Sequence, residues 1–311
     1  MSFGASPTMS NYPYGFSFGV SLRNMPIAQT QGGQVFWVYN GSALPPTGKP
    51  GSNTNRGTFD APFATIAGAL TACLAGRGDI IMVKPGHAES VTAATLLNLN
   101  VAGAQIIGAG VGSNRPVLTL SGATTATITV SGANITLRNF IIDLTGIDAI
   151  AAGMTVNASG FQLLDCEIFT ASASAQATLG VSIATGLSDI VIAGNEFYGT
   201  ADAGTTAAVQ IVGGVRHLIA DNIFFGAYAA GTGAISVITT ASAGLKIVGN
   251  SISNRTAAST KAITALTGTT GVILNNRMQI LSGTAPITAD AMSWAGANYY
   301  AAAIATAGTL I

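Results

Sequence analysis

The chain has 311 residues, of which 12 are basic and 12 are acidic, so its formal net charge is zero. Charged residues make up 8% of the sequence, and no basic cluster exists, which excludes the usual nucleic-acid-binding proteins. Two cysteines cannot form a disulfide framework, no long apolar run predicts a membrane helix, and no basic-then-apolar start predicts a secretory signal. We therefore expect a protein made in the cytoplasm, without nucleic-acid or membrane partners, whose weakly charged surface is covered by copies of itself or by a larger assembly.

Residues 1–57 differ from the rest of the chain because they are rich in aromatic residues and show no periodicity. The stretch from Gly48 to Gly57 is polar and reads as a loop. Such a segment can cap the end of a repeat domain or dock onto a partner, and both interpretations stay open. For the docking interpretation, the candidate residues are Tyr12, Tyr14, Phe16, Phe18, Phe36, Trp37 and Tyr39.

Residues 60–76 predict a helix. Asp60 suits the N-cap position, Pro62 falls in the first turn, and Gly76 and Gly78 end the pattern. The apolar residues of the segment lie on a single face. Because the first coil of a solenoid otherwise exposes its core and an unpaired edge, this helix is placed to cap the N-terminal end of the repeats.

An eight-residue signature, apolar-x-apolar-x-x-Asn-x-apolar, recurs down the middle of the chain. The Asn position is occupied by Asn195, Asn222, Asn250 and Asn276, and two earlier copies carry Phe140 and Cys166 there. A period of this length with strand alternation predicts stacked coils of short strands. The fold class is therefore all-β: a right-handed parallel β-helix over residues 58–283, with the helix 60–76 as its cap and residues 1–57 as an irregular arm.

The four asparagines are predicted to have a structural role. In stacked coils, one Asn per coil forms a ladder of side-chain amides, and Asn also tolerates the left-handed backbone of a sharp kink. Phe140 and Cys166 occupy the same position and are predicted to be core residues. Beyond the repeats, residues 284–311 lose the signature, and we expect them to cover the last coil or contact another subunit.

Two segments resemble the start of pectin-lyase-like β-helix proteins of tailed bacteriophages. They are Gly57–Ile66, which reads GTFDAPFATI, and Gly78–Glu89, which reads GDIIMVKPGHAE. The resemblance implies a homotrimeric structural protein of the virion, carried on the capsid surface. It further implies a decoration or cement protein that contacts the major capsid protein through its N-terminal arm. Neither a cofactor nor a metal is implied.

An enzymatic alternative rests on Glu167 and Glu196, which follow the repeat position on neighbouring coils. Stacking places their backbones about 5 Å apart, near the separation of a retaining glycosidase pair. The alternative is a receptor-binding tailspike that binds or cleaves a host polysaccharide. The acidic clusters and motifs of related hydrolases and lyases are missing, and few aromatic residues beyond Phe224, Phe225 and Tyr228 suggest a sugar-binding surface. We therefore expect a chain that is not an enzyme, with His87 and His217 in structural roles.

Overall fold

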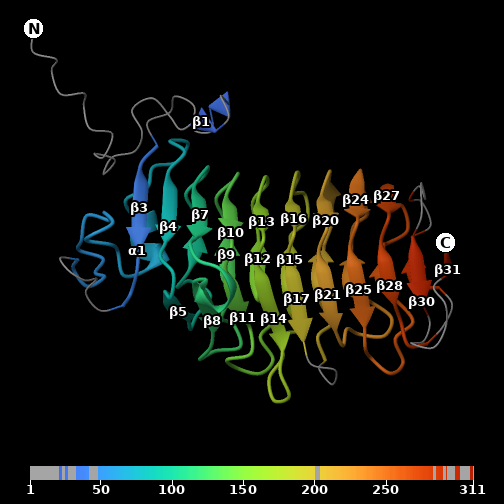
Figure 1. Ribbon diagram of the computed structural model, residues 1–311. Helices are drawn as coiled ribbons and strands as arrows, with labels where there is room; N and C mark the ends of the chain where they lie inside the picture. Colours follow the sequence, from blue (N-terminus) through green and yellow to red (C-terminus); the bar gives the residue numbers. More distant parts are fainter. Residues whose placement is uncertain are drawn as a thin grey trace, which may run out of the picture.

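The computed structural model describes residues 21–22, 25–26, 33–41, 48–199, 204–282, 285–289, 292, 298–301 and 309–310. Three parallel sheets run along the molecule, and the chain passes through them in the same order in every coil (Figure 1). We call them sheet I, sheet II and sheet III, in the order in which a coil visits them. The predicted parallel β-helix is confirmed, and it has eight coils that contribute to all three sheets.

Sheet I consists of β3 (Val35–Val38), β4 (Ile80–Val83), β7 (Gln105–Gly108), β10 (Thr136–Arg138), β13 (Gln162–Leu164), β16 (Val191–Ala193), β20 (Leu218–Ala220), β24 (Leu245–Val248) and β27 (Gly271–Leu274). Sheet II consists of β5 (Ala88–Val91), β8 (Val117–Leu120), β11 (Ile141–Asp143), β14 (Glu167–Ala171), β17 (Glu196–Gly199), β21 (Ile223–Gly226), β25 (Ser251–Asn254), β28 (Arg277–Gln279) and β30 (Tyr299–Ala301), with β31 (Thr309–Leu310) antiparallel at its end.

Sheet III consists of β6 (Asn98–Leu99), β9 (Ile128–Val130), β12 (Met154–Val156), β15 (Leu179–Ile183), β18 (Ala207–Ile211), β22 (Ile235–Val237), β26 (Ile263–Thr264) and β29 (Ile287–Thr288). Two small pairs lie outside these sheets. They are β1 (Ser21–Leu22) with β2 (Met25–Pro26), and β19 (Gly214–Val215) with β23 (Ser242–Ala243). A short 3-10 helix, η1, spans Gly112–Asn114.

The core is a set of stacked rows because alternate strand residues point inward and adjacent coils align in register. Along sheet II, the inward row includes Ile168, Phe197 and Phe224, all buried. The rings of Phe197 and Phe224 stack with centroids 4.9 Å apart. Each coil thus repeats the contacts of the coil before it, which explains why one short signature recurs at nearly constant spacing.

The turn between sheets I and II explains the Asn signature. It also shows that the Asn is not the residue with the left-handed backbone, as the sequence analysis had suggested. The left-handed backbone falls on the residue before the repeat position, for example Asp165, Asp221 and Asn275, with φ of 53°, 53° and 55°. The asparagine that follows faces inward and is buried, as Asn222 is. Asn at the repeat position therefore serves hydrogen bonding and not the kink.

The helix is shorter than the sequence pattern indicates. It is α1 (Ile66–Leu70), and its N-cap is Thr65, whose hydroxyl accepts a hydrogen bond from the Gly68 N–H group. Asp60 is therefore not the N-cap, because Phe63 instead forms a parallel bridge with Val38 in extended backbone. The helix buries Ile66, Ala69 and Leu70 against the first strands. Its position at the end of the stack agrees with the predicted capping role.

The N-terminal boundary of the solenoid also lies earlier than predicted. Residues 35–38, which fall in the predicted arm, form β3, the first strand of sheet I, in register with β4. Their alternation places Phe36 and Val38 in the core. The coiled part of the chain therefore begins before residue 58.

Candidate functional site

Three aromatic side chains lie in a row on the outer face of sheet II. Phe169, Tyr198 and Phe225 are aligned partners on the adjacent strands β14, β17 and β21. The rings of Phe169 and Tyr198 meet edge to face with centroids 5.8 Å apart, and those of Tyr198 and Phe225 stack at 5.6 Å with an interplanar angle of 6°. We call this row the aromatic stripe.

A guanidinium group extends the aromatic stripe at one end. The central carbon of the Arg255 guanidinium lies 4.7 Å from the centroid of the Phe225 ring. Arg255 follows β25, so the contact crosses from one coil to the next. A planar cation over a ring face is attracted by the ring quadrupole. The guanidinium group therefore extends the row of rings and adds N–H donors at its end.

Glu167 and Glu196 lie beside the aromatic stripe. Each precedes an aromatic residue by two positions on the same strand, so acid and ring share one face. The two glutamates are aligned partners on β14 and β17, which places their backbones about 4.8 Å apart. The structure therefore brings the two predicted acids together and adds a stripe of aromatic rings next to them.

The two glutamates have different surroundings. Glu167 forms an ion pair with the Arg115 guanidinium, which also contacts the Asp165 carbonyl oxygen. Glu196 is exposed, and its carboxylate has no hydrogen-bond or ion-pair partner in the described part of the chain. Of the two carboxylates, Glu196 is thus the one free to accept hydrogen bonds from a ligand.

The strand alternation could have located this surface from the sequence. Phe224 and Tyr228, which we considered as surface aromatics, are fully buried, whereas Phe225 points outward. Phe169 and Tyr198 were not considered as surface residues, although each lies two positions after a predicted outward glutamate. Applying the two-residue period beyond the glutamates identifies Phe169 and Tyr198, and the alignment of β21 with β17 adds Phe225.

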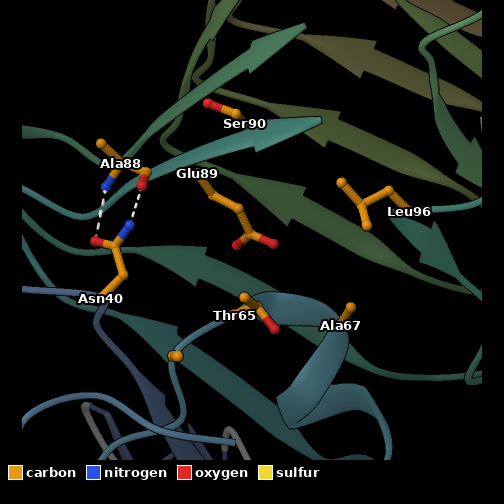
Figure 2. Close-up of a pocket in the computed structure, with 8 residues that line it drawn as sticks. Asn40, Thr65, Ala67, Ala88, Glu89, Ser90 and Leu96 are labelled. Carbon is orange, nitrogen blue, oxygen red and sulfur yellow. Dashed lines mark hydrogen bonds between the residues drawn. The ribbon is translucent and has the colours of Figure 1, made fainter. Parts of the chain in front are cut away.

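A separate cleft of about 370 Å³ lies at the N-terminal end, between α1 and β5 (Figure 2). Its carboxylate belongs to Glu89, whose side chain is 9% exposed. One Glu89 oxygen accepts hydrogen bonds from the Ile66 N–H group at 3.0 Å and from His87 Nε2 at 3.1 Å. His87 Nδ1 accepts from the Asn40 N–H group at 3.2 Å. These bonds tie β3, α1 and β5 together, so this pair has a structural role.

His217 is also fully integrated in the fold. Its ring is buried, Nδ1 accepts from the Ile190 N–H group at 3.3 Å, and Nε2 donates to the Gly213 carbonyl oxygen at 3.3 Å. Burial lowers the pKa of His217. The neutral ring with its proton on Nε2 thus has a hydrogen-bond partner at each nitrogen.

The asparagines form a continuous ladder inside the turn between sheets I and II. Each side-chain oxygen accepts from the backbone N–H group of the preceding repeat residue, as Asn222 does from Asn195 at 2.9 Å. Each amide group donates to the oxygen of the next Asn, as Asn222 does to Asn250 at 3.0 Å. The ladder continues to Asn298, which the period did not reveal because Asn298 follows Asn276 by 22 residues, whereas the earlier steps are 26 to 28 residues.

Three of the predicted docking residues, Phe36, Trp37 and Tyr39, lie within the described ranges. Tyr12, Tyr14, Phe16 and Phe18 lie outside the described residues. Phe36 is buried, so its side chain is not available to a partner. Trp37 packs edge to face on Phe59 with ring centroids 4.9 Å apart, and the Lys84 ammonium lies 3.6 Å from the Phe59 centroid. Trp37 and Tyr39 are both partly exposed.

Within the described ranges, no group of three or more His, Cys, Asp or Glu side chains could hold a metal ion. In the same part of the chain, no helix has the length and apolar character needed to cross a membrane. The outer face of sheet II combines aromatic rings with a free carboxylate and runs across several coils. A row of this length suits an extended ligand better than a compact small molecule, whose sites are usually concave.

The fold and this surface define a parallel β-helix with an aromatic and acidic outer face. No family model matches the chain, and no curated protein matches it. Among solved structures, it resembles a rhamnogalacturonan lyase at 15% sequence identity, with a TM-score of 0.44, over 79% of this chain and 74% of that chain. This likeness concerns the fold and assigns no role to any residue.

The comparison corrects one expectation from the sequence. We expected a chain that is not an enzyme, whereas the structure that it resembles is, by its name, a lyase. The expectation relied on missing acidic motifs, and such motifs belong to particular families and not to the fold. We therefore withdraw it. The resemblance to phage proteins stays a prediction, and its coarser part, the parallel β-helix, is confirmed.

Proposed function

We propose that the outer face of sheet II binds a polysaccharide chain. The observation that carries the proposal is the aromatic stripe, three rings on successive coils beside a free carboxylate. Aromatic rings offer large, rigid contact area to the apolar faces of sugar rings, and carboxylates accept hydrogen bonds from hydroxyl groups. A polymer lying across the coils meets one ring at each strand spacing of about 4.8 Å.

Substitutions in the aromatic stripe test this proposal. Tyr198→Ala and Phe225→Ala remove rings from the surface without touching the core, so the fold is retained. We expect each to weaken binding about tenfold, equivalent to about 1.4 kcal/mol, in calorimetric titrations against a panel of neutral, acidic and amino-sugar polysaccharides. Leu266→Ala is the control, since Leu266 is 37% exposed but lies away from the stripe. Equal binding by all four proteins contradicts the proposal.

The same polysaccharides test whether Glu167 and Glu196 act as the acids of a cleavage reaction. If the chain shortens a bound polymer, Glu196→Gln removes a carboxylate that can exchange protons with the ligand while keeping its shape. We expect this variant to bind the polymer and to lose cleavage, as judged by the reducing ends released. A Glu196→Gln protein that cleaves as fast as the unmodified chain excludes Glu196 from the reaction.

A second proposal places the protein on a bacteriophage particle, as a capsid decoration protein or as a receptor-binding tailspike. Its support is the sequence resemblance of residues 57–66 and 78–89, together with the low charge of the chain. Docking through the N-terminal arm is tested by deleting residues 1–32, which leaves β3 in place. We expect the truncated protein to fold and to be missing from purified particles. If it is incorporated at the normal level, the arm is not the docking segment.

A further inference from the structure

The cleft between α1 and β5 contains a carboxylate at a position where the next coils carry apolar residues. Glu89 is the aligned partner of Leu118 on β8, and Leu118 is the aligned partner of Ile142 on β11. Leu118 and Ile142 are buried core residues. Within the described residues, β5 is the edge strand of sheet II, so Glu89 is the first member of an inward row and faces α1.

The protein uses one of the two carboxylate oxygens of Glu89. Oε2 accepts hydrogen bonds from the Ile66 N–H group at 3.0 Å and from His87 Nε2 at 3.1 Å. In the described part of the chain, Oε1 has no hydrogen-bond partner. Figure 2 shows the carboxylate reaching into the space between α1 and β5. The bonds that hold Glu89 in place therefore leave an acceptor oxygen for a ligand in the cleft.

The negative charge of Glu89 is not balanced by its neighbours. His87 Nδ1 accepts from the Asn40 N–H group at 3.2 Å, so the ring proton lies on Nε2 and the ring is neutral. Within the described ranges, Glu89 forms no ion pair with a lysine or an arginine. Its side chain is 9% exposed. Because a buried charge without a partner is costly, a cation that enters the cleft is favoured.

The walls of the cleft indicate which kind of cation fits. Ala64, Ala67, Ala88 and Leu96 give the cleft an apolar lining. A second cleft of about 260 Å³ shares Ala67 and Leu96 with the first, so the apolar surface continues beyond it along α1. The carboxylate of Glu89 thus lies beside an apolar trough. A ligand with a cationic head and an aliphatic stem matches both parts.

The amide and hydroxyl groups nearest the carboxylate already have partners within the protein. The Asn40 amide group donates to the Ala88 carbonyl oxygen, and its oxygen accepts from the Ala88 N–H group at 3.2 Å (Figure 2). Thr65 Oγ1 accepts from the Gly68 N–H group at 2.9 Å. A neutral sugar therefore finds few free partners here, and an anion is repelled by Glu89.

The chemistry of the lining also selects the type of cationic head. Quaternary ammonium groups are recognised by aromatic rings, and none of the described residues that line the cleft is aromatic. A metal ion needs several ligands, and no group of three or more His, Cys, Asp or Glu occurs within the described ranges. A primary ammonium group carries N–H donors and can satisfy the free oxygen of Glu89.

We propose that this cleft binds a primary ammonium group on an aliphatic stem, with Glu89 as the acceptor of its N–H groups. The stem lies on Ala67 and Leu96. This inference does not depend on polysaccharide binding, because the aromatic stripe lies on β14, β17 and β21. Free alkylamines and lysine side chains share this chemistry.

Calorimetric titration of the full chain tests the proposal. Hexylamine is expected to bind, and hexanol, which has the same stem without the charge, is expected to bind about tenfold more weakly. The hexyltrimethylammonium ion should also bind more weakly than hexylamine because it has no N–H donor. Binding of N-acetyl-lysine methylamide as tight as that of hexylamine assigns the cleft to lysine side chains, and weaker binding assigns it to free amines. Equal binding of hexylamine and hexanol, or no binding of hexylamine, overturns the proposal.

Glu89→Gln identifies the acceptor. Glutamine keeps an oxygen for the Ile66 N–H group and for His87 Nε2 but removes the charge. The affinity for hexylamine is expected to fall about tenfold, with that for hexanol unchanged. Asp221→Asn is the control, since it removes an exposed carboxylate from a distant turn where Asn tolerates the φ of 53°. Unchanged hexylamine affinity in Glu89→Gln, or an equal loss in both variants, contradicts the assignment.

Ala67→Leu covers the case in which Glu89→Gln does not fold. Leucine is a good helix former, so α1 is retained, and its larger side chain fills the cleft while Glu89 stays in place. We expect a loss of affinity for hexylamine of about tenfold or more, with circular dichroism verifying the fold. A folded Ala67→Leu protein that binds hexylamine as tightly as the native chain rejects this cleft as the binding site.

Discussion

At the residue scale, the Asn ladder explains why one polar residue is retained in an otherwise apolar row. Asn222 donates to the Ile192 carbonyl oxygen at 2.9 Å and to Asn250, and it accepts from the backbone and side chain of Asn195. Asn195, whose N–H group donates to Asn222, lies in the turn between β16 and β17, outside both strands. Because a buried unpaired donor or acceptor costs about 1 to 3 kcal/mol, each Asn satisfies groups that an apolar residue cannot.

Asn222→Ala is therefore expected to lower the free energy of unfolding by about 2 to 4 kcal/mol, from hydrogen bonds lost to both neighbouring coils and from the unpaired Asn195 N–H group on the preceding coil. Equilibrium denaturation by urea measures this change. Asn157→Ala is the control, since Asn157 is exposed and belongs to no ladder. A change of the same size in both variants would show that the ladder adds nothing beyond an ordinary surface Asn.

His217 predicts a pH dependence of stability. Burial lowers its pKa from the ordinary value of 6.5, so the folded state binds its proton less readily than the unfolded state. Stability from the neutral ring is thus present above about pH 6.5 and is lost as pH falls from there toward the lower pKa of the folded state. Denaturation midpoints measured between pH 8 and pH 5 should fall in the native chain and fall less in His217→Gln. Equal slopes in the two proteins contradict this assignment.

At the element scale, Asp79 holds the first coil together. Burial alone raises the pKa of Asp79, but hydrogen bonds from Arg77, from the Gln34 N–H group and from the Leu74 N–H group outweigh it, so the pKa lies below its ordinary value. One carboxylate thus links the segment before β3, the turn after α1 and the start of β4. Within the described residues, β3 is the edge strand of sheet I and no earlier coil pairs with it, so this end of the solenoid depends on the link.

Acidification is expected to loosen this end first. A carboxyl with a lowered folded pKa contributes stability above the unfolded value near 3.8, and this contribution is lost as pH falls through the folded pKa. Protection of β3 and β4 against hydrogen exchange, taken relative to the intrinsic rate at each pH, should therefore fall below about pH 4 in the native chain, before the protection of β16 and β20 does. In Asp79→Asn, exchange of β3 and β4 should already be fast at neutral pH. Unchanged exchange in this variant would show that Asp79 does not hold the first coil.

The sequence alone predicted some of the secondary-structure elements and missed others. The repeat predicted the strands, their turns and the inward rows, because the two-residue period and the Asn turn are local features. The predicted extent of α1 was wrong because Phe63 pairs with Val38 and so cannot be helical. That pairing joins residues far apart in the sequence, and a local pattern does not reveal it. The pairing of Glu167 with Arg115 was out of reach for the same reason: Arg115 lies two coils earlier.

At the scale of the whole molecule, the three outer faces differ in chemistry although the coils are alike. The outward residues of sheet I are mostly aliphatic, with a polar stretch on β7, β10 and β13. Those of sheet II include aromatic rings, acids and arginines, and those in the central row of sheet III are polar and uncharged. The inward residues have to meet the same packing requirement in every coil, so they were predictable from the repeat. The outward residues do not have to meet that requirement, so the repeat does not predict them. Their grouping into faces follows from the way the coils stack.

The central claim is that sheet II holds a polysaccharide on its aromatic stripe. The most direct test is a structure of the chain bound to an oligosaccharide chosen from the binding panel. We predict sugar rings stacked over Phe169, Tyr198 and Phe225, with a hydroxyl group hydrogen-bonded to Glu196. Sugar bound on another face or in the cleft beside Glu89, with the aromatic stripe bare, would contradict the account.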